Sequence, residues 1–262
     1  MMSLIELNKM SCRIGRKLIL EEVSCAIGHG ERIAIVGPNG AGKSTFLKVV
    51  MGMLPAEDGE NVKMAGVPVN RLARKEIAKK VAYVPQVTTQ LFPFTVRHFV
   101  EMARYAHQSP WEGISAEDRE FCKNVLARTG MAEFAERTLD TLSGGELQRV
   151  WIAGAVAQGT EMLLLDEALS QMDYRFQQRA ADLLAELNRE EKKTVVQVTH
   201  DVNRAALESG RILALAGGRL IFDGPPREMM TEDVLHRVYG VRLRLIDVPG
   251  VELPMVIPGN SL

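Results

Sequence analysis

This 262-residue chain contains few cysteines, and its positive and negative charges nearly balance. The three cysteines, Cys12, Cys25 and Cys122, are odd in number and widely spaced, which argues against a disulfide framework and against a zinc site. We expect reduced thiols, as in cytosolic proteins. The net charge of −1 offers no basic surface of the kind that binds nucleic acid, so no nucleic-acid partner is expected.

Long apolar runs are also missing. No stretch of about 18 apolar residues occurs, so the chain is not expected to span a membrane. The first ten residues contain Glu6, Asn8 and Lys9, where a signal peptide needs an unbroken apolar stretch. We therefore expect a cytoplasmic protein, whose role at a membrane would come through a partner.

Short apolar runs alternate with helical patterns, which predicts an α/β fold with a mainly parallel sheet covered by helices. The predicted core strands are residues 32–36, 81–84, 162–165, 194–198 and 211–215. Four further runs predict an additional antiparallel β portion: 4–10, 18–27, 62–65 and 219–223.

Strand patterns are absent between residues 91 and 158, where Thr95 and Ser115 are expected to cap two helices. We interpret residues 90–158, approximately, as a helical subdomain inserted into a single domain that covers residues 1–262.

The last part of the chain, residues 241–262, contains three prolines among apolar residues. It predicts a C-terminal extension that forms an irregular edge strand or a wrap.

The stretch GPNGAGKST follows a predicted strand and precedes a predicted helix, which is the context of a phosphate-binding P-loop. Its glycines allow successive backbone N–H groups to converge on phosphate oxygens, and the helix N-terminus adds partial positive charge. Lys43 is expected to reach the β- and γ-phosphates, and Ser44 to bind Mg²⁺. The alternative is a glycine-rich turn that binds nothing. The predicted nucleotide-binding residues are Gly37, Pro38, Asn39, Gly40, Ala41, Gly42, Lys43, Ser44 and Thr45.

An apolar strand, MLLLDE, ends in two carboxylates. At the carboxyl end of a parallel strand Asp166 is expected beside the P-loop, where it can hold Mg²⁺. Glu167 is then placed to act as the general base that polarises an attacking water. Alone, such a pair is more often a solvated strand end.

Two more polar residues follow predicted core strands. His200, after 194–198, is expected at the same sheet edge, where its imidazole could contact the γ-phosphate or position the water. Gln86, after 81–84, could contact Mg²⁺ or the water through its amide. Either residue alone has an ordinary structural interpretation.

A second glycine pair occurs in LSGGELQR. Ser143 is a natural N-cap for a helix over 146–157, which makes another helix end suited to an anion. Far from its own P-loop this helix end would lack a phosphate. We therefore expect two copies of the chain to pair head to tail, with Ser143, Gly144, Gly145 and Glu146 acting on the partner's ATP. The alternative is an ordinary capped helix.

In this order, GPNGAGKST, Gln86, LSGGE, MLLLDE, Asp173 and His200 resemble the motifs of ABC-transporter ATPase subunits, over residues 4–240. The resemblance implies a P-loop NTPase core, ATP and Mg²⁺ as cofactors, and an ATP-sandwich dimer beneath membrane-spanning permease subunits. It makes Gln86 the Q-loop residue, Asp173 the D-loop residue and His200 the switch histidine. It also implies that grooves at the Q-loop and helical lobe receive the permease.

Two stretches, YVPQ…FPFTVRHFVEMARY and DVLHRVYGVRLRLI, resemble importers of iron-siderophores, haem and cobalamin. This implies an external substrate-binding protein and a position on the inner face of the cell membrane. An importer for another substrate, such as a free metal ion, is the alternative.

The chain departs from the family in two places. Ile14 stands where an aromatic residue usually stacks on adenine. The segment ALSQMD retains Asp173, but Ala168 replaces a proline, and Gln171 and Met172 change a loop that faces the partner chain.

Other functions were weighed against this one. A soluble ABC-type ATPase acting on DNA or ribosomes tends to carry two ATPase units or a coiled-coil insertion, and neither is visible. A small-molecule P-loop kinase would not need LSGGE. The basic residues of 71–80 fit an amphipathic helix better than a nucleic-acid or lipid surface.

Overall fold

The computed structural model describes residues 3–86, 93–108, 113–170 and 172–257. Backbone contacts divide the chain into two compact units. The first unit joins Met1–Leu72 to Val196–Leu262, and the second is Ala73–Val195. The predicted α/β class is confirmed, while the assignment of one domain with an inserted helical subdomain stays a prediction.

The first unit contains a four-stranded antiparallel sheet in the order β2-β1-β4-β5. Its strands are β1 (Ile5–Ile14), β2 (Lys17–Ile27), β4 (Val62–Met64) and β5 (Val67–Pro68). The two long strands pair from Ile5 opposite Ile27 to Ile14 opposite Lys17, with register shifts on the way. The predicted antiparallel portion is therefore confirmed, with a longer first strand than the sequence pattern indicated.

A second set of strands lies in the order β10-β9-β3-β8, with β8 at the boundary between the two units. Its strands are β3 (Arg32–Val36), β8 (Thr194–Val198), β9 (Arg211–Ala216) and β10 (Arg219–Gly224). β3 pairs in parallel with β9, and β10 pairs antiparallel with β9. Because all four strands coincide with predicted ones within one residue, the apolar runs alone were sufficient to locate them.

The helices of the first unit follow its strands. They are α1 (Lys43–Val50), α7 (Val202–Glu208), α8 (Pro226–Met229) and α9 (Glu232–Tyr239). Among the described residues before Ala73, two 3-10 turns occur, Gly59–Asn61 and Val69–Arg71. The helix predicted over 71–80 is therefore too long at its start: α2 (Arg74–Lys80) begins after Ala73, whose N–H donates to Glu76 at 2.7 Å.

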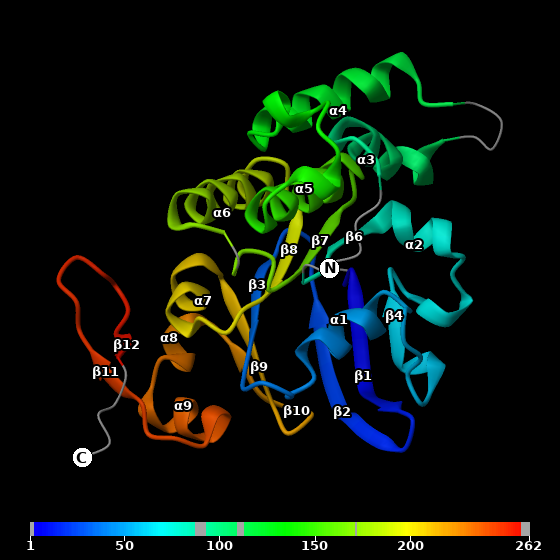
Figure 1. Ribbon diagram of the computed structural model, residues 1–262. Helices are drawn as coiled ribbons and strands as arrows, with labels where there is room; N and C mark the ends of the chain where they lie inside the picture. The colour runs from blue at the N-terminus through cyan, green and yellow to red at the C-terminus, as the bar shows by residue number, and fades with distance from the viewer. Residues whose placement is uncertain (1–2, 87–92, 109–112, 171, 258–262) are drawn as a thin grey trace. The chain divides into compact units, whose positions relative to one another are not determined.

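The C-terminal segment differs from the expected irregular edge strand or wrap. β11 (Arg244–Ile246) and β12 (Met255–Ile257) form a separate antiparallel hairpin. Figure 1 shows this hairpin in red, and β12 contacts α7. The hairpin packs through Leu243, Leu245 and Val256 on a buried cluster that includes Val36 and Val202. Residues 258–262 lie outside the described residues.

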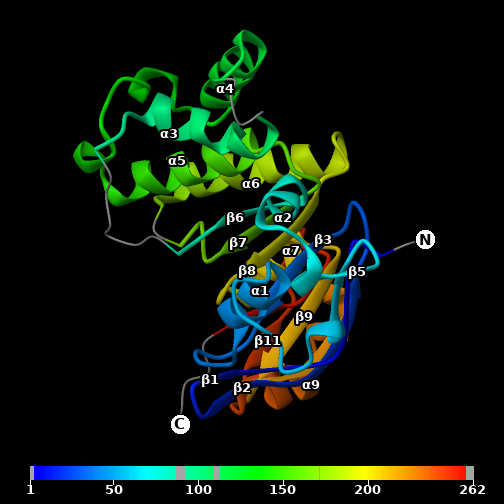
Figure 2. The same ribbon diagram turned by 90° about the vertical axis from the view of Figure 1, so that its right-hand side faces the viewer.

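The second unit contains the parallel pair β6 (Val81–Val84) and β7 (Met162–Asp166). Figure 2 shows its helices above these strands. Besides α2 they are α3 (Val96–Met102), α4 (Ala116–Arg128), α5 (Gly144–Ala157) and α6 (Tyr174–Arg189). The core of this unit is formed by the facing sides of α3, α5, α6 and the two strands.

Two of the predicted helix caps, at α3 and α4, are present. Thr95 accepts from His98 N–H at 3.2 Å, and Ser115 accepts from Asp118 N–H at 3.0 Å. α3 ends at Met102, and a 3-10 turn over Ala103–His107 follows. Among the residues that the structure describes, no helix combines the length and apolar character needed to cross a membrane.

Candidate functional site

The phosphate loop joins β3 to α1 and depends on glycine. Gly37, Gly40 and Gly42 have φ values of 140°, 78° and 98°, a region that side chains with a Cβ rarely adopt. A Cβ on Gly37 would lie 1.9 Å from the carbonyl oxygen of Leu215, and one on Gly42 would lie 2.6 Å from Leu20. The backbone is therefore packed too closely for larger residues.

The helix that follows this loop starts without a side-chain cap. The N-cap of α1 is Gly42, and no side chain bonds to the N-terminus there. Lys43 is 6% exposed, and its ammonium donates to the carbonyls of Gly37 at 2.8 Å and Pro38 at 3.0 Å. The loop thus folds around a buried cation at a helix N-terminus, which is an arrangement that binds anions.

The histidine loop, residues 199–201, follows β8. His200 is exposed, and the preceding Thr199 N–H donates to the Ile35 carbonyl at 3.1 Å. Asp201 caps α7 by accepting from Arg204 N–H at 3.0 Å. Because Ile35 lies two residues before Gly37, the first unit ties the histidine loop to the strand that enters the phosphate loop.

In the second unit the first acidic residue of the pair is buried. Asp166 is the last residue of β7 and is 3% exposed. Its carboxylate accepts from the Tyr83 hydroxyl at 3.0 Å. Burial and the adjacent carboxylate raise the pKa of Tyr83, so this hydroxyl stays a donor. The sequence reasoning missed Tyr83, although its position at the end of the neighbouring strand was visible.

Glu167, the second acidic residue of the pair, is hydrogen-bonded to the predicted glutamine, Gln86. The amide of Gln86 donates to the carboxylate of Glu167 at 3.2 Å. Glu167 has a φ of 49°, and Ser170 closes the turn by donating from its N–H and hydroxyl to the Glu167 carbonyl. A left-handed glutamate directly after a strand is an uncommon conformation that is often found at functional sites. The structure therefore brings together two of the predicted catalytic side chains.

The second glycine pair begins α5, as predicted, with Ser143 as N-cap. The Glu146 carboxylate accepts from the Ser143 hydroxyl at 2.7 Å and from its N–H at 2.8 Å. These bonds from Ser143 lower the pKa of Glu146. In this chain the serine is thus held by its own helix in a capping box.

An arginine side chain, Arg149, lies near Ser143. A cavity of about 590 Å³ is lined by Ser143, Gly145, Glu146 and Arg149, together with residues from 130–134 and from 172–179. Arg149 is 9% exposed, and its Nε has no hydrogen-bond partner among the described residues. Its guanidinium carbon lies 3.8 Å from the centre of the Phe176 ring. Burial lowers the pKa of Arg149, yet the group remains a cation at neutral pH.

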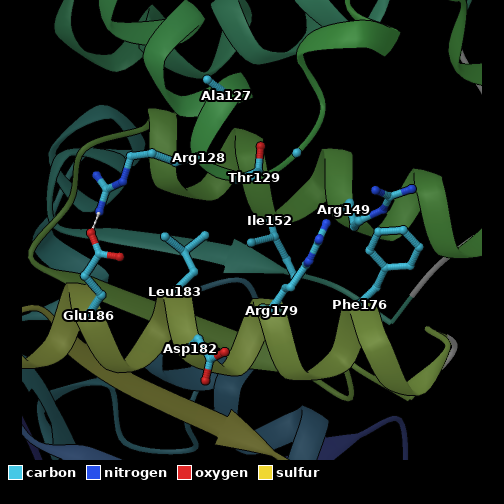
Figure 3. Close-up of a pocket in the computed structure, with 12 residues that line it drawn as sticks. Ala127, Arg128, Thr129, Arg149, Ile152, Phe176, Arg179, Asp182, Leu183 and Glu186 are labelled. Carbon is cyan, nitrogen blue, oxygen red and sulfur yellow. Dashed lines mark hydrogen bonds and ion pairs between the residues drawn. The ribbon is translucent and has the colours of Figure 1, made fainter.

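The groove beside this cavity is shown in Figure 3, where residues of α4, α5 and α6 meet. Arg149, Phe176 and Arg179 lie together at one end, and Arg128 pairs with Glu186 at 2.9 Å at the other. Two arginines, Arg149 and Arg179, thus lie at one end of the groove, where the carboxylates of Glu146 and Asp173 also act on Arg149.

Of the remaining predicted site residues, Asp173 lines the same cavity as Ser143 and Gly145. Ile14 ends β1 and is 50% exposed, so its side chain is accessible to a base. Asp173 caps α6 by accepting from Phe176 N–H at 3.0 Å. Ala168 and Met172 are buried in the core of the second unit, and Gln171 lies outside the described residues.

The predicted metal ligands supply oxygen atoms only. Ser44, Gln86 and Asp166 are a hydroxyl, an amide and a carboxylate, and Mg²⁺ prefers such hard donors. Within the described part of the chain, no group of three or more His, Cys, Asp or Glu side chains could hold a metal by itself. The donor set therefore fits an ion that shares its ligands with a bound nucleotide, as Mg²⁺ does in phosphoryl transfer.

A glycine loop with a buried lysine after a strand defines a nucleotide-binding P-loop protein. Comparison with known proteins is more specific. Residues 20–170 match the family model described as ABC transporter. The chain belongs to this family, and it is an ATP-binding protein and ATPase.

Individual relatives cover nearly the whole chain. The iron(3+)-hydroxamate import ATP-binding protein FhuC of Bacillus subtilis is 37% identical, over 98% of this chain and 95% of the relative. The ferric enterobactin transport ATP-binding protein FepC of Escherichia coli is 36% identical, over 93% of this chain and 90% of the relative. A dimeric ATP-binding cassette in a post-hydrolysis state with ADP and Pi has a TM-score of 0.75 and 30% identity, covering 85% of this chain and 99% of the cassette.

Proposed function

We propose that this protein is the ATP-hydrolysing subunit of a membrane importer that takes up a ferric chelate. The observation that carries the proposal is the geometry of the phosphate loop, with three glycines in left-handed or related conformations and Lys43 buried beneath them. The relatives named for hydroxamate and enterobactin uptake support the class of substrate.

The chemistry is assigned to residues of both units. Lys43 and the N–H groups from Gly40 to Thr45 bind the phosphates of ATP, and Ile14 packs on the base. Ser44, Asp166 and Gln86 would hold Mg²⁺, which would supply charge neutralisation at the phosphates. Glu167 accepts the proton of the attacking water, and Gln86 orients that carboxylate through the bond described above. His200 contacts the γ-phosphate side of the nucleotide.

The second nucleotide contact comes from a second copy of the chain. Ser143, Gly144 and Gly145 at the start of α5 close over ATP held by the partner, and Asp173 faces the partner. The cavity beside Ser143 supports this assignment, because it contains the buried Arg149, whose Nε has no hydrogen-bond partner among the described residues. Two chains, each with one complete phosphate loop and one α5, then enclose two nucleotides.

The permease is proposed to dock on the helical part of the second unit. A groove of about 220 Å³ is lined by Tyr83, Phe99, Met102, Trp151 and small residues of α5. Phe99 and Trp151 meet edge-on, with ring centres 4.9 Å apart, and Met102 is 47% exposed. An amphipathic helix presented by a membrane subunit fits such an apolar groove. Tyr83 also bonds to Asp166, so docking there is linked to the acidic pair.

The decisive experiment uses Glu167→Gln. Without a general base, hydrolysis should fall by about 10²–10⁴-fold while ATP binding is retained. Light scattering with Mg-ATP should then find a dimer of the variant, and a monomer without nucleotide. A variant that hydrolyses at the normal rate contradicts the role of Glu167, and one that stays monomeric, alone and with its permease, contradicts the shared site.

Uptake assays decide the substrate. The permease that co-purifies with the chain would be placed in vesicles with its binding protein. Ferric hydroxamate, ferric enterobactin, haem, cobalamin and free metal ions would be compared as substrates. ATP-dependent uptake of a ferric chelate supports the proposal, uptake of a free metal ion favours the second candidate, and failure to recover any permease favours a soluble ATPase.

A further inference from the structure

Tyr83 contributes to two sites of the second unit. Its hydroxyl donates to the Asp166 carboxylate at 3.0 Å, and the same residue lines the docking groove of about 220 Å³ with Phe99 and Trp151. On β6, Tyr83 lies in register with Leu164 of β7, two residues before Asp166. Two residues of a strand span about 6–7 Å, a distance that an extended tyrosine side chain covers. Tyr83 therefore connects the groove with a predicted Mg²⁺ ligand.

The Tyr83 hydroxyl is suited to orienting this ligand. Asp166 is 3% exposed and Tyr83 is half-buried, so the bond between them is partly buried. Hydrogen bonds to a ligating carboxylate fix its orientation, and their loss typically lowers metal affinity or activity about 10- to 100-fold. Because Tyr83 contacts a proposed ligand, and not the metal or the nucleotide, it is a positioning residue.

The docking groove is small, and its walls are fixed. At about 220 Å³ it is below the range of about 300–1,000 Å³ that is typical of small-molecule sites, so it admits a side chain or two rather than a cofactor. α3 and α5 approach so closely that a Cβ on Gly154 would lie 3.0 Å from the Phe99 ring. The Gln158 amide, at the C-terminal end of α5, donates to the Ala78 carbonyl of α2 at 2.6 Å. A side chain that fills the groove therefore packs against Tyr83 without reshaping the walls.

The helix α2 beside the groove is basic, with the sequence RKEIAKK. Lys75 and Lys79 are exposed on it, and Lys79 follows the residue that Gln158 contacts. Lys75 donates to the Gln108 carbonyl at 2.7 Å and lies near the exposed ring of Tyr105. A partner suited to this region carries a large apolar side chain for the groove and an acidic residue for α2. A helix of the permease can present both on one face.

We propose that Tyr83 couples docking of the permease to binding of Mg²⁺ at Asp166. A large apolar side chain of a permease helix fills the groove and restrains Tyr83, which then holds the Asp166 carboxylate in its metal-binding orientation. This inference rests on the proposed function, in which the permease occupies the groove and Asp166 is a ligand of Mg²⁺. Because coupling between two binding sites is reciprocal, the permease should bind the Mg²⁺-loaded chain more tightly by the same factor.

The first test is Tyr83→Phe in the Glu167→Gln chain, which is expected to bind ATP without turnover. Mn²⁺ serves as the probe, because it takes the same oxygen ligands as Mg²⁺ and its free form is counted by electron paramagnetic resonance. We expect the Mn²⁺ affinity of the ATP-loaded chain to fall roughly 10-fold, with an unchanged ATP affinity in EDTA. Tyr105→Phe is the matched control, because Tyr105 is 73% exposed.

The second test is Phe99→Leu, which shortens one wall of the groove and leaves the Tyr83 hydroxyl in place. We expect the affinity for the purified permease to fall roughly 10-fold, with an unchanged Mn²⁺ affinity of the isolated chain. Phe121→Leu is the control, because Phe121 on α4 is 38% exposed and lies outside the groove. This pair of variants separates the docking end of Tyr83 from its metal end.

The coupling itself is measured on the complex with the permease. In the Glu167→Gln background with ATP, the complex in lipid nanodiscs should bind Mn²⁺ roughly 5-fold more tightly than the isolated chain, or better. In the Tyr83→Phe complex this gain should disappear, although the permease still binds.

Each outcome decides between the two proposals. If the original chain binds Mg-ATP and the permease, but Tyr83→Phe matches it in Mn²⁺ affinity and in the gain on docking, the coupling is refuted and the proposed function stands. A Tyr83→Phe chain with a lowered Tm and weaker ATP binding in EDTA would show a purely structural role and also refute the coupling. If the original chain binds neither Mg-ATP nor a permease, the proposed function itself fails.

Discussion

The two glycine-flanked helix starts of this chain, at α1 and at α5, look alike in sequence but differ in chemistry. α1 starts after Gly42 without a side-chain cap, over a lysine that is buried in its own loop. α5 starts after Ser143 and is closed by the carboxylate of Glu146. The start of α1 therefore has a lysine available for a phosphate. At the start of α5, the Glu146 carboxylate accepts the hydrogen bonds that Ser143 can donate.

This difference shows why a phosphate loop can serve a chain alone, while the second helix end cannot. The carboxylate of Glu146 competes with any external phosphate for the Ser143 hydroxyl and N–H. A ligand must therefore arrive with other contacts already made, and the partner's phosphate loop provides them in the proposed dimer. Arg149, which lies further along α5 and is buried and stacked on Phe176, adds a positive charge near this helix start.

Among the variants that test the difference between the starts of α1 and α5, Lys43→Ala is expected to have the largest effect. If α1 binds ATP without help, losing charge-assisted bonds to two phosphates should weaken the affinity of the isolated chain about 100-fold or more. Isothermal titration calorimetry measures this directly, with Lys48→Ala on the same helix as control. An unchanged affinity would refute the proposal that the phosphate loop binds ATP through Lys43.

Gly145→Asp should separate binding from hydrolysis. An acidic residue suits the first turn of a helix, so the fold should be retained, but it repels a phosphate at α5. We expect hydrolysis to fall about 10- to 100-fold, with ATP affinity of the single chain unchanged. Gly113→Asp is the control, because a Cβ there meets no atom within 4 Å. If the isolated Gly145→Asp chain instead lost affinity for ATP, α5 would contact the ATP bound by the same chain and not the ATP of a partner.

The smallest effect is expected for Glu146→Ala, which opens the capping box. Loss of the cap should lower Tm by about 2–4 °C at neutral pH. Because the folded-state pKa of Glu146 is lowered, its contribution is present above the ordinary value of 4.5 and is lost as pH falls through the lowered pKa. The Tm difference from the original protein should therefore shrink below about pH 4.

Melting curves between pH 3 and 8 measure this pH dependence. Glu120→Ala serves as control, because Glu120 forms an exposed pair with Lys123. A difference that stays constant down to pH 3 would show that the carboxylate charge has no part in the cap.

Much of the fold was predictable from local patterns. The strands 32–36, 81–84 and 194–198 coincide with β3, β6 and β8, because each is a short apolar run between polar turns. The caps Thr95, Ser115 and Ser143 were also predictable, since capping depends on residues three positions apart. The start of α2 was not, because Ala73 is no typical cap and Glu76 takes over that role.

The sequence by itself therefore determined the class of protein and located the loop proposed to bind phosphate, because a P-loop is a continuous stretch whose function depends on local backbone geometry. Only the tertiary structure decided which distant residues contact one another. Tyr83 with Asp166 is separated by 83 positions, and Asn203 with Val256 by 53. Such pairs form because folding brings strand ends and helix starts together, and no pattern within one element records which residue will meet which.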